Sequence, residues 1–148
     1  MIEVVQLLDF KQIKQAWTDL SIYSGFQQEV ARDVWVPHPS LLQHTLGIFL
    51  QDKLIGVGGF TSCYYNNVFQ AHIGMYKDYR GHINTIPAAK KCINWLFSNV
   101  ICVMIVAKPL NSLSRKVAES VGFEAGAAGS GEYYLRKSVW ENQLESPM

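Results

Sequence analysis

The sequence of 148 residues has little net charge and no long apolar run. Its 13 Lys and Arg residues nearly balance 12 Asp and Glu residues, for a formal charge of +1. It therefore has no broad basic field, and we expect no nucleic-acid partner. No apolar run reaches the roughly 20 residues of a membrane span, so we expect no membrane association. The first ten residues hold two acids and no basic segment, so we expect no secretory signal peptide.

Cysteines are few. Cys63, Cys92 and Cys102 are odd in number and lack the spacing of metal ligands. We therefore expect no metal ion, and we expect free, buried thiols in a reducing cytoplasm.

The balance of residue types that are present predicts a globular protein. Hydrophobic residues make up 49% of the chain and charged residues 17%. The length suits one domain with a sizeable core. We expect that domain over residues 1–137, followed by a C-terminal tail over 138–148 that is frayed from Glu141.

In the first half of the chain, residues 2–7 predict a strand, and Asp9 is a cap for the helix that follows. The pattern over residues 21–43 is weaker. Residues 45–51 and 53–65 then predict a hairpin with its turn at Asp52 and Lys53. A third strand is expected over 68–77, after a turn at Asn66 and Asn67.

In the second half, helices and strands alternate. Apolar residues from Ile86 to Phe97 step by three and four, which predicts an amphipathic helix. Residues 100–107 form a continuous apolar run typical of a buried central strand. A helix capped by Asn111 or Ser112 should end at Gly122, and residues 131–139 predict a last strand. This order predicts an α+β or α/β sheet with helices packed against it.

A basic turn joins the third strand to the amphipathic helix, over the stretch from Arg80 to Thr85. Thr85 is the expected helix cap, and Pro87 fits the first turn, where its missing N–H is not needed. Free N–H groups and the helix dipole favour anions at such a position. The turn holds one glycine, Gly81, where a phosphate cradle usually has several.

Three segments resemble the GCN5-related N-acetyltransferase (GNAT) family: the strand into "DYRG", the apolar run 100–107, and "NSLSRKVAESVGFEAG" over 111–126. The third segment looks most like the ribosomal-protein N-acetyltransferase branch. It matches that branch in Asn111, Ser114, Lys116-Val117, Gly122-Phe123 and Glu124. The resemblance spans about residues 2–137.

The resemblance implies a three-layer α+β fold and a site. The fold is a mixed, mostly antiparallel sheet of about six or seven strands with about four helices, in which the fourth and fifth strands splay apart. Acetyl-coenzyme A would lie in that splay. The backbone of Ile73 and Met75 would pair with the pantetheine arm. The remaining expected contacts are Arg80, Gly81, His82, Ile83, Asn84, Thr85 and Asn111.

Two departures from the family pattern bear on binding and on proton transfer. Ile83 and Thr85 stand where the family has glycines, and Ile strongly disfavours positive φ. This predicts weak or absent binding of coenzyme A, and a larger contribution of Arg80 to the affinity that remains. Ala118 replaces a Tyr that protonates the thiolate in many relatives. Ser114 is the remaining candidate donor, unless it only caps its helix.

The reaction that the resemblance implies is acyl transfer to an amine, which must lose a proton. The candidate bases are His72, Glu29, Asp33 and His38. A histidine in a strand is more often a satisfied core or edge residue, and Glu29 and Asp33 fit a solvated helix face. "GVGGF" over 56–60 lies within a strand, so it predicts a close approach or a bulge rather than a phosphate loop.

Three functions remain open on the sequence. The first is an acetyl-coenzyme A-dependent N-acetyltransferase with a small-molecule or peptide amine as acceptor. The second is a catalytically silent GNAT-like interaction or assembly protein, such as phages encode. The third is a module that binds acyl-coenzyme A without transfer. A homodimer is left open.

Overall fold

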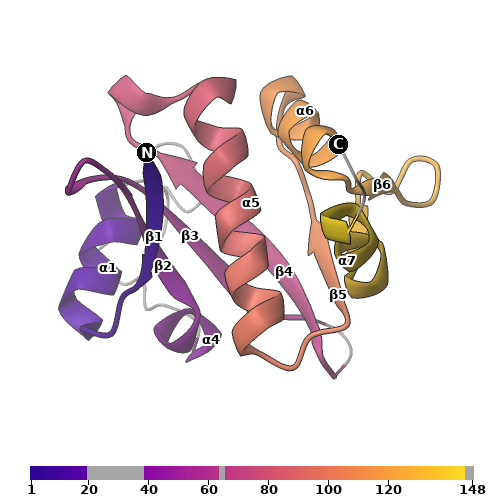
Figure 1. Ribbon diagram of the computed structural model, residues 1–148, viewed down its shortest axis with the longest axis horizontal. Helices are drawn as coiled ribbons and strands as arrows, with labels where there is room; N and C mark the ends of the chain where they lie inside the picture. Colours follow the sequence, from indigo (N-terminus) through magenta and orange to yellow (C-terminus); the bar gives the residue numbers. More distant parts are fainter. Residues whose placement is uncertain (20–38, 64–65, 146–148) are drawn as a thin grey trace.

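The computed structural model describes residues 1–19, 39–63 and 66–145 (Figure 1). These residues form a seven-stranded sheet of order β1-β2-β3-β4-β5-β7-β6, in which only β4 and β5 pair in parallel. The strands are β1 (Ile2–Gln6), β2 (Thr45–Leu50), β3 (Lys53–Ser62), β4 (Val68–Met75), β5 (Met104–Ala107), β6 (Glu124–Ala125) and β7 (Tyr133–Arg136). The helices are α1 (Phe10–Asp19), α4 (Pro39–Gln43), α5 (His82–Asn99), α6 (Ser112–Val121) and α7 (Lys137–Glu145), with a 3₁₀ turn η1 (Lys77–Tyr79). The predicted mixed α+β fold is confirmed.

The glycine-rich stretch of β3 lets helices approach both faces of the sheet. Consecutive strand residues point to opposite faces. A Cβ at Gly58 would lie 2.7 Å from the sulfur of Cys92 in α5, and one at Gly59 would lie 2.6 Å from the ring of Trp17 in α1. Thus α5 covers one face and α1 the other. The larger core lies under α5 and the smaller under α1. The predicted close approach is confirmed, and a register shift in the β2–β3 pairing adds an irregularity beside Gly56.

We expect Gly59→Ala to lower the free energy of unfolding by about 1–3 kcal/mol, as overpacking typically does. The added methyl group would meet the buried ring of Trp17, which is also held by its hydrogen bond to Thr45 (3.2 Å). Urea denaturation of the variant measures the loss. Trp17→Phe removes the nearest obstructing atoms and leaves the Leu41 methyl group (2.8 Å), so the double variant should lose less than the sum of the two single changes. Additive losses would contradict this packing.

The parallel pairing of β4 and β5 is short. It covers only Val68–Gln70 against Met104–Val106. β4 continues to Met75, so its last five residues lie beyond the pairing. In Figure 1 the two strands diverge toward the N-terminal end of α5. The predicted splay is thus confirmed, and we call the point past the Gln70–Val106 pair the fork.

The strand predicted over 100–107 is too long. β5 begins only at Met104, and Val100 is the C-cap of α5. Ile101 and Val103 are 80% and 54% exposed. The chain needs these residues to cross from the end of α5 back to the sheet. The prediction from this apolar run therefore made the strand too long and its first residues too buried.

The predicted last strand and C-terminal tail also need correction. β7 ends at Arg136, and α7 follows at once, although a strand was expected to 139 and a tail over 138–148. Trp140 is 5% exposed and lies 6.5 Å from the Phe97 ring, measured between ring centroids. One large apolar side chain docks this helix on the core, while most of its other described residues stay partly or fully exposed.

The cysteines are free, as predicted, but only Cys92 and Cys102 are buried. Burial raises the pKa of the Cys92 thiol to about 12 and that of Cys102 to about 11. Cys63 is half-buried instead. Among the described helices, none is long and apolar enough to cross a membrane. The described residues also contain no group of three or more potential metal ligands.

Candidate functional site

The edge of β4 beyond the fork presents unpaired backbone groups. The amide of Tyr76 donates to the carbonyl of Ile55 (2.9 Å), so even-numbered residues of β4 bond to β3. Because backbone groups alternate in direction along an antiparallel ladder, the N–H and C=O of Ile73 and Met75 point to the other edge. In the described part of the chain, that edge has no strand partner beyond the fork. An extended ligand with amide groups could complete it.

The N-terminus of α5 lies just after this edge. Gly81 is the N-cap with φ 119° and ψ 168°, a conformation that glycine alone adopts readily. The amide of Thr85 donates to the carbonyl of Gly81 (3.0 Å) as the first helical bond. The amides of His82, Ile83 and Asn84 therefore lack intrahelical acceptors. The predicted cap at Thr85 is wrong, because the helix begins three residues earlier and Gly81 supplies the turn.

This earlier start changes the meaning of Ile83 and Thr85. Both lie inside α5, and the positive-φ residues other than glycine in the described chain are Gln51, Asp52 and Asn67. Ile83 therefore needs no strained backbone, and its side chain is 88% exposed. Pro87 is the sixth helical residue, not part of the first turn, so the Ile83 carbonyl receives no bond from it.

Basic side chains surround this helix start. Arg80 and Lys77 are exposed in the turn before it, and Lys53 lies over the Tyr79 ring, 5.2 Å from its centroid. The side-chain amide of Asn84 donates to the Tyr79 carbonyl (3.2 Å), which ties the helix to η1. Free amides, a helix dipole and three cations, against the one carboxylate of Asp78 in the same turn, together favour a bound anion.

The start of α6 follows β5 on the opposite side of the fork. The Asn111 Oδ1 accepts hydrogen bonds from the Ser114 amide (2.8 Å) and the Ser114 hydroxyl (2.9 Å). Asn111 is therefore the cap of α6, and the Ser114 hydroxyl is bonded to that cap. Leu113, in the first turn of α6, is 37% exposed. Gly122 ends the helix at φ 113°, as predicted.

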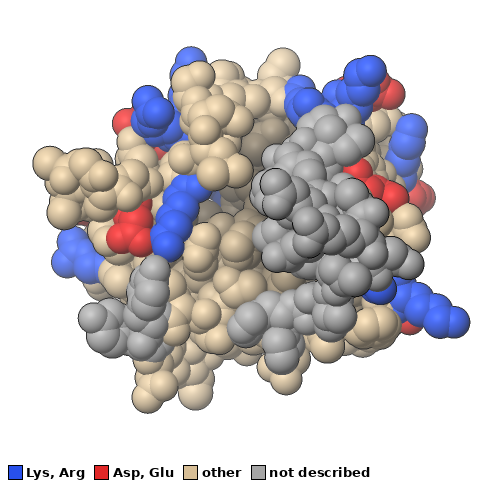
Figure 2. All heavy atoms as spheres, turned by 180° about the vertical axis from the view of Figure 1, so that it is seen from behind, with Lys and Arg blue, Asp and Glu red and all other residues tan. Residues whose placement is uncertain are grey.

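The sheet face opposite α5 carries a second group of polar side chains. His72 lies on this face, 6.5 Å from Trp17 between ring centroids, and its Nε2 is 2.9 Å from the Thr61 hydroxyl. Figure 2 shows this side of the molecule, where basic and acidic side chains stand near a hollow. Of the other candidate bases, Glu29, Asp33 and His38 lie outside the described residues.

Across the fork from His72 lies a cluster of Lys108, Glu132 and Tyr134, and the sequence patterns did not single out Lys108 or Glu132. The Lys108 Nζ is 3.4 Å from Glu132 Oε2, and the Tyr134 hydroxyl donates to Glu132 Oε1 (2.7 Å). The Tyr134 hydrogen bond, assisted by Lys108, lowers the pKa of the Glu132 carboxyl. No motif joins these residues, because strand pairing alone brings Lys108 and Glu132 together.

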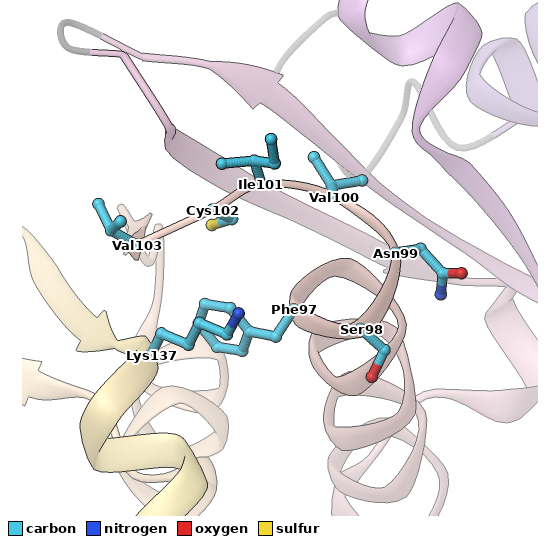
Figure 3. Close-up of a pocket in the computed structure, with 8 residues that line it drawn as sticks. All are labelled: Phe97, Ser98, Asn99, Val100, Ile101, Cys102, Val103 and Lys137. Atoms are coloured by element: carbon cyan, nitrogen blue, oxygen red, sulfur yellow. The ribbon is translucent and has the colours of Figure 1, made fainter.

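A separate hollow of about 390 Å³ lies at the other end of α5 (Figure 3). It is lined by residues 97–103 and Lys137. Most of this lining belongs to the loop between α5 and β5. It holds none of the predicted site residues, so we do not assign the site there.

Solved structures share this architecture. An acetyltransferase (GNAT family) from Bacillus anthracis has a TM-score of 0.61 at 15% identity, over 90% of this chain and 92% of its own. Aminoglycoside acetyltransferase AAC(6')-Ib, solved with coenzyme A, has a TM-score of 0.70 at 12% identity, over 97% and 99%. Mutant forms of the spermidine/spermine N-acetyltransferase SpeG from Vibrio cholerae give 0.69 at 13%, over 97% and 98%.

Sequence comparison adds nothing to this, since no protein-family model matches the chain and no curated protein matches it either. The likeness therefore rests on three-dimensional structure. From its sheet order, its fork and these structural neighbours, the chain has the fold of the GNAT acetyltransferases.

Proposed function

We propose that this chain is an acetyl-coenzyme A-dependent N-acetyltransferase that acts on a primary amine. The observation that carries the proposal is the unpaired edge of β4 at Ile73 and Met75, set beside the free amides at the start of α5. Coenzyme A is an extended chain with amide groups at one end and phosphates at the other. Two structural neighbours support the two proposed substrates, the cofactor and the amine: one is solved with coenzyme A, and another is named for acetylating spermidine and spermine.

Each half of the substrate has a matching set of residues. The backbone of Ile73 and Met75 would pair with the pantetheine amides as an added strand does. The amides of Gly81, His82, Ile83 and Asn84, with Thr85 behind them and Arg80 beside them, would hold the pyrophosphate. The silent alternative drew its support from the missing glycines at 83 and 85. Since neither position needs positive φ, that support is gone.

The transfer step uses groups on both sides of the fork. His72 takes a proton from the acceptor ammonium. The neutral amine attacks the thioester carbonyl, and an N–H of β4 stabilises the oxyanion. The new C–N bond forms and the C–S bond breaks, and the second proton, which the nitrogen loses after it is acylated, is passed on to the thiolate of coenzyme A. We assign Ser114 as the donor, held by Asn111, and we keep Glu29 as an alternative base.

The sequence supports two finer proposals, on the branch of the family and on the cellular compartment. We place it near the ribosomal-protein-type branch because segment 111–126 carries that branch's pattern, and its Asn111–Ser114 cap supports the segment's helical start. We also place the reaction in the cytoplasm, where three free thiols persist.

Calorimetry with acetyl-coenzyme A tests the proposal, followed by a thiol-release assay with amines. We expect binding, and we expect Gly81→Ala to weaken it roughly tenfold or more. An alanine at φ 119° is strained by about 1–3 kcal/mol, so the helix start and its amides shift.

Gly129→Ala is the matched control. Gly129 also has positive φ (82°), and a Cβ at either glycine meets nothing within 4 Å. Both variants therefore place an alanine at positive φ without a steric clash, but only Gly81 lies at the α5 start. Equal losses of affinity in both variants would place the cofactor elsewhere, and no binding by the wild type would reject the proposal.

A further inference from the structure

The fork has two opposed polar sides on the face opposite α5. His72 lies two residues past Gln70, and Lys108 lies two residues past Val106, which is the partner of Gln70. In parallel strands, two residues that lie the same number of positions past a facing pair point to the same face of the sheet. Leu135 and Ile105 pack in the core under α5, so Val106 and Tyr134 point to the other face. The Lys108–Glu132–Tyr134 cluster thus faces the same side as His72.

Glu132 is the fixed member of this cluster. Its carboxylate accepts the Tyr134 hydroxyl and faces the Lys108 ammonium. Its backbone is held as well, since its carbonyl accepts from the Gly126 amide (2.8 Å) and its amide donates to the Ser130 hydroxyl (3.2 Å). The side chain of Glu132 is 22% exposed, against 38% for Lys108. Lys108 has a flexible four-carbon stem and is the partner that can leave.

The Lys108–Glu132 pair shows which charge the site accepts. The primary ammonium of Lys108 already pairs with Glu132, across the fork from the proposed base. If Lys108 swings into solvent, a carboxylate held by Tyr134 stays behind. The vacated position is therefore anionic and partly enclosed, and a second primary ammonium fits it chemically.

We infer that Glu132 determines acceptor specificity by binding a second ammonium group, so that the preferred acceptor is a diamine or polyamine. This inference rests on the proposed function. One amine stays charged at Glu132 in place of Lys108, while the other loses its proton near His72 and is acetylated. Two strand spacings, about 10 Å at the paired level, separate the β4 and β7 backbones. His72 and Glu132 lie past this level, where the strands diverge, so the acceptor has to bridge the span between them.

Three acceptors of equal chain length test the inference with the full-length protein: 1-aminobutane, 1,4-diaminobutane and 4-aminobutanoate. They differ only in a neutral, cationic or anionic far end. Thiol release from acetyl-coenzyme A gives kcat/KM for each. A hydrogen bond to a charged group is worth about 1.5–3 kcal/mol, so we expect the diamine to exceed the monoamine by roughly tenfold to a hundredfold. The anionic amine should be the poorest.

Variants of the cluster assign this preference to a residue. Glu132→Gln should reduce the diamine to the level of the monoamine, and Lys108→Met should improve the diamine by removing its competitor. Glu124→Gln is the control: Glu124 forms a comparable ion pair with Arg136 (3.7 Å) one strand farther out, and its loss should leave the preference intact.

Three outcomes would overturn the inference: equal use of diamine and monoamine, a preference unchanged in Glu132→Gln, or a preference for 4-aminobutanoate that Lys108→Met abolishes. Calorimetry of 1,4-diaminobutane with the protein saturated by coenzyme A provides a second readout. If coenzyme A binds but the diamine neither binds nor reacts, the inference fails and the proposed function stands. If coenzyme A itself does not bind, the proposed function fails first.

Discussion

Replacing His72 by glutamine is expected to lower kcat for amine acetylation by about 10²–10⁴-fold, the usual contribution of a general base. His72 lies at the fork on the face opposite α5, within 2.9 Å of the Thr61 hydroxyl. Glutamine keeps a polar side chain that can bond Thr61, but it cannot take a proton at neutral pH. Affinity for acetyl-coenzyme A should change little, because the proposed contacts of the cofactor lie elsewhere.

The pH dependence of kcat separates catalysis from structure in this variant. The wild type should show an acidic limb from a single group, and that limb should be absent in His72→Gln. Thr61→Val serves as the control, since it removes the hydrogen-bond partner and keeps the imidazole. It should lower kcat less and keep the limb. A His72→Gln enzyme with normal kcat would show that the base is another residue, with Glu29 the next to test.

Truncation of Trp140 to alanine is expected to lower the free energy of unfolding by about 3–5 kcal/mol, as the loss of a buried Trp typically does. Trp140 is 5% exposed and packs near Phe97, so α7 is fixed to α5 mainly through this side chain. A loss of this size would unfold a large fraction of a marginally stable domain. Chemical denaturation followed by far-UV circular dichroism measures it.

Trp140→Phe gives this prediction its control. The indole Nε1 of Trp140 is buried and has no hydrogen-bond partner among the described residues. Phenylalanine removes that unsatisfied donor and keeps most of the apolar ring, so its cost should be well below that of alanine. If Trp140→Ala unfolds at the wild-type denaturant concentration, residues from 138 onward behave as the tail that the sequence suggested.

Element type was easier to predict than element boundaries. The amphipathic pattern from Ile86 to Phe97 identified α5, but the helix starts at His82, because Gly81 provides a turn that no side-chain cap announces. The apolar run before Ala107 identified β5, but its first residues only cross from helix to sheet. Hydrophobic pattern reports which residues avoid water. It does not report where a backbone bond ladder begins or ends.

The residues of the candidate site also fall into those that could be predicted and those that needed the structure. The basic turn could be predicted from the sequence, since a strand followed by a helix start places it there, while Ile73 and Met75 were implied by the family resemblance. Glu132 and Lys108 could not, because they come from segments 24 residues apart that only the β5–β7 pairing joins. Whether Ile83 must adopt a strained positive φ also required the structure, since the φ of this residue depends on where the helix begins.

The sequence by itself determined the alternation of strands and helices, the start of α6 to within the two cap candidates Asn111 and Ser112, its end at Gly122 and the glycines that admit α1 and α5. These features depend on neighbours in the chain, on side-chain size and on backbone preference. Tertiary structure alone decided where the pairing of β4 with β5 ends, that α7 docks through Trp140 and that the Glu132 carboxylate lies on the same sheet face as His72. Each of these is a contact between distant segments, and its free energy depends on packing that local pattern does not encode.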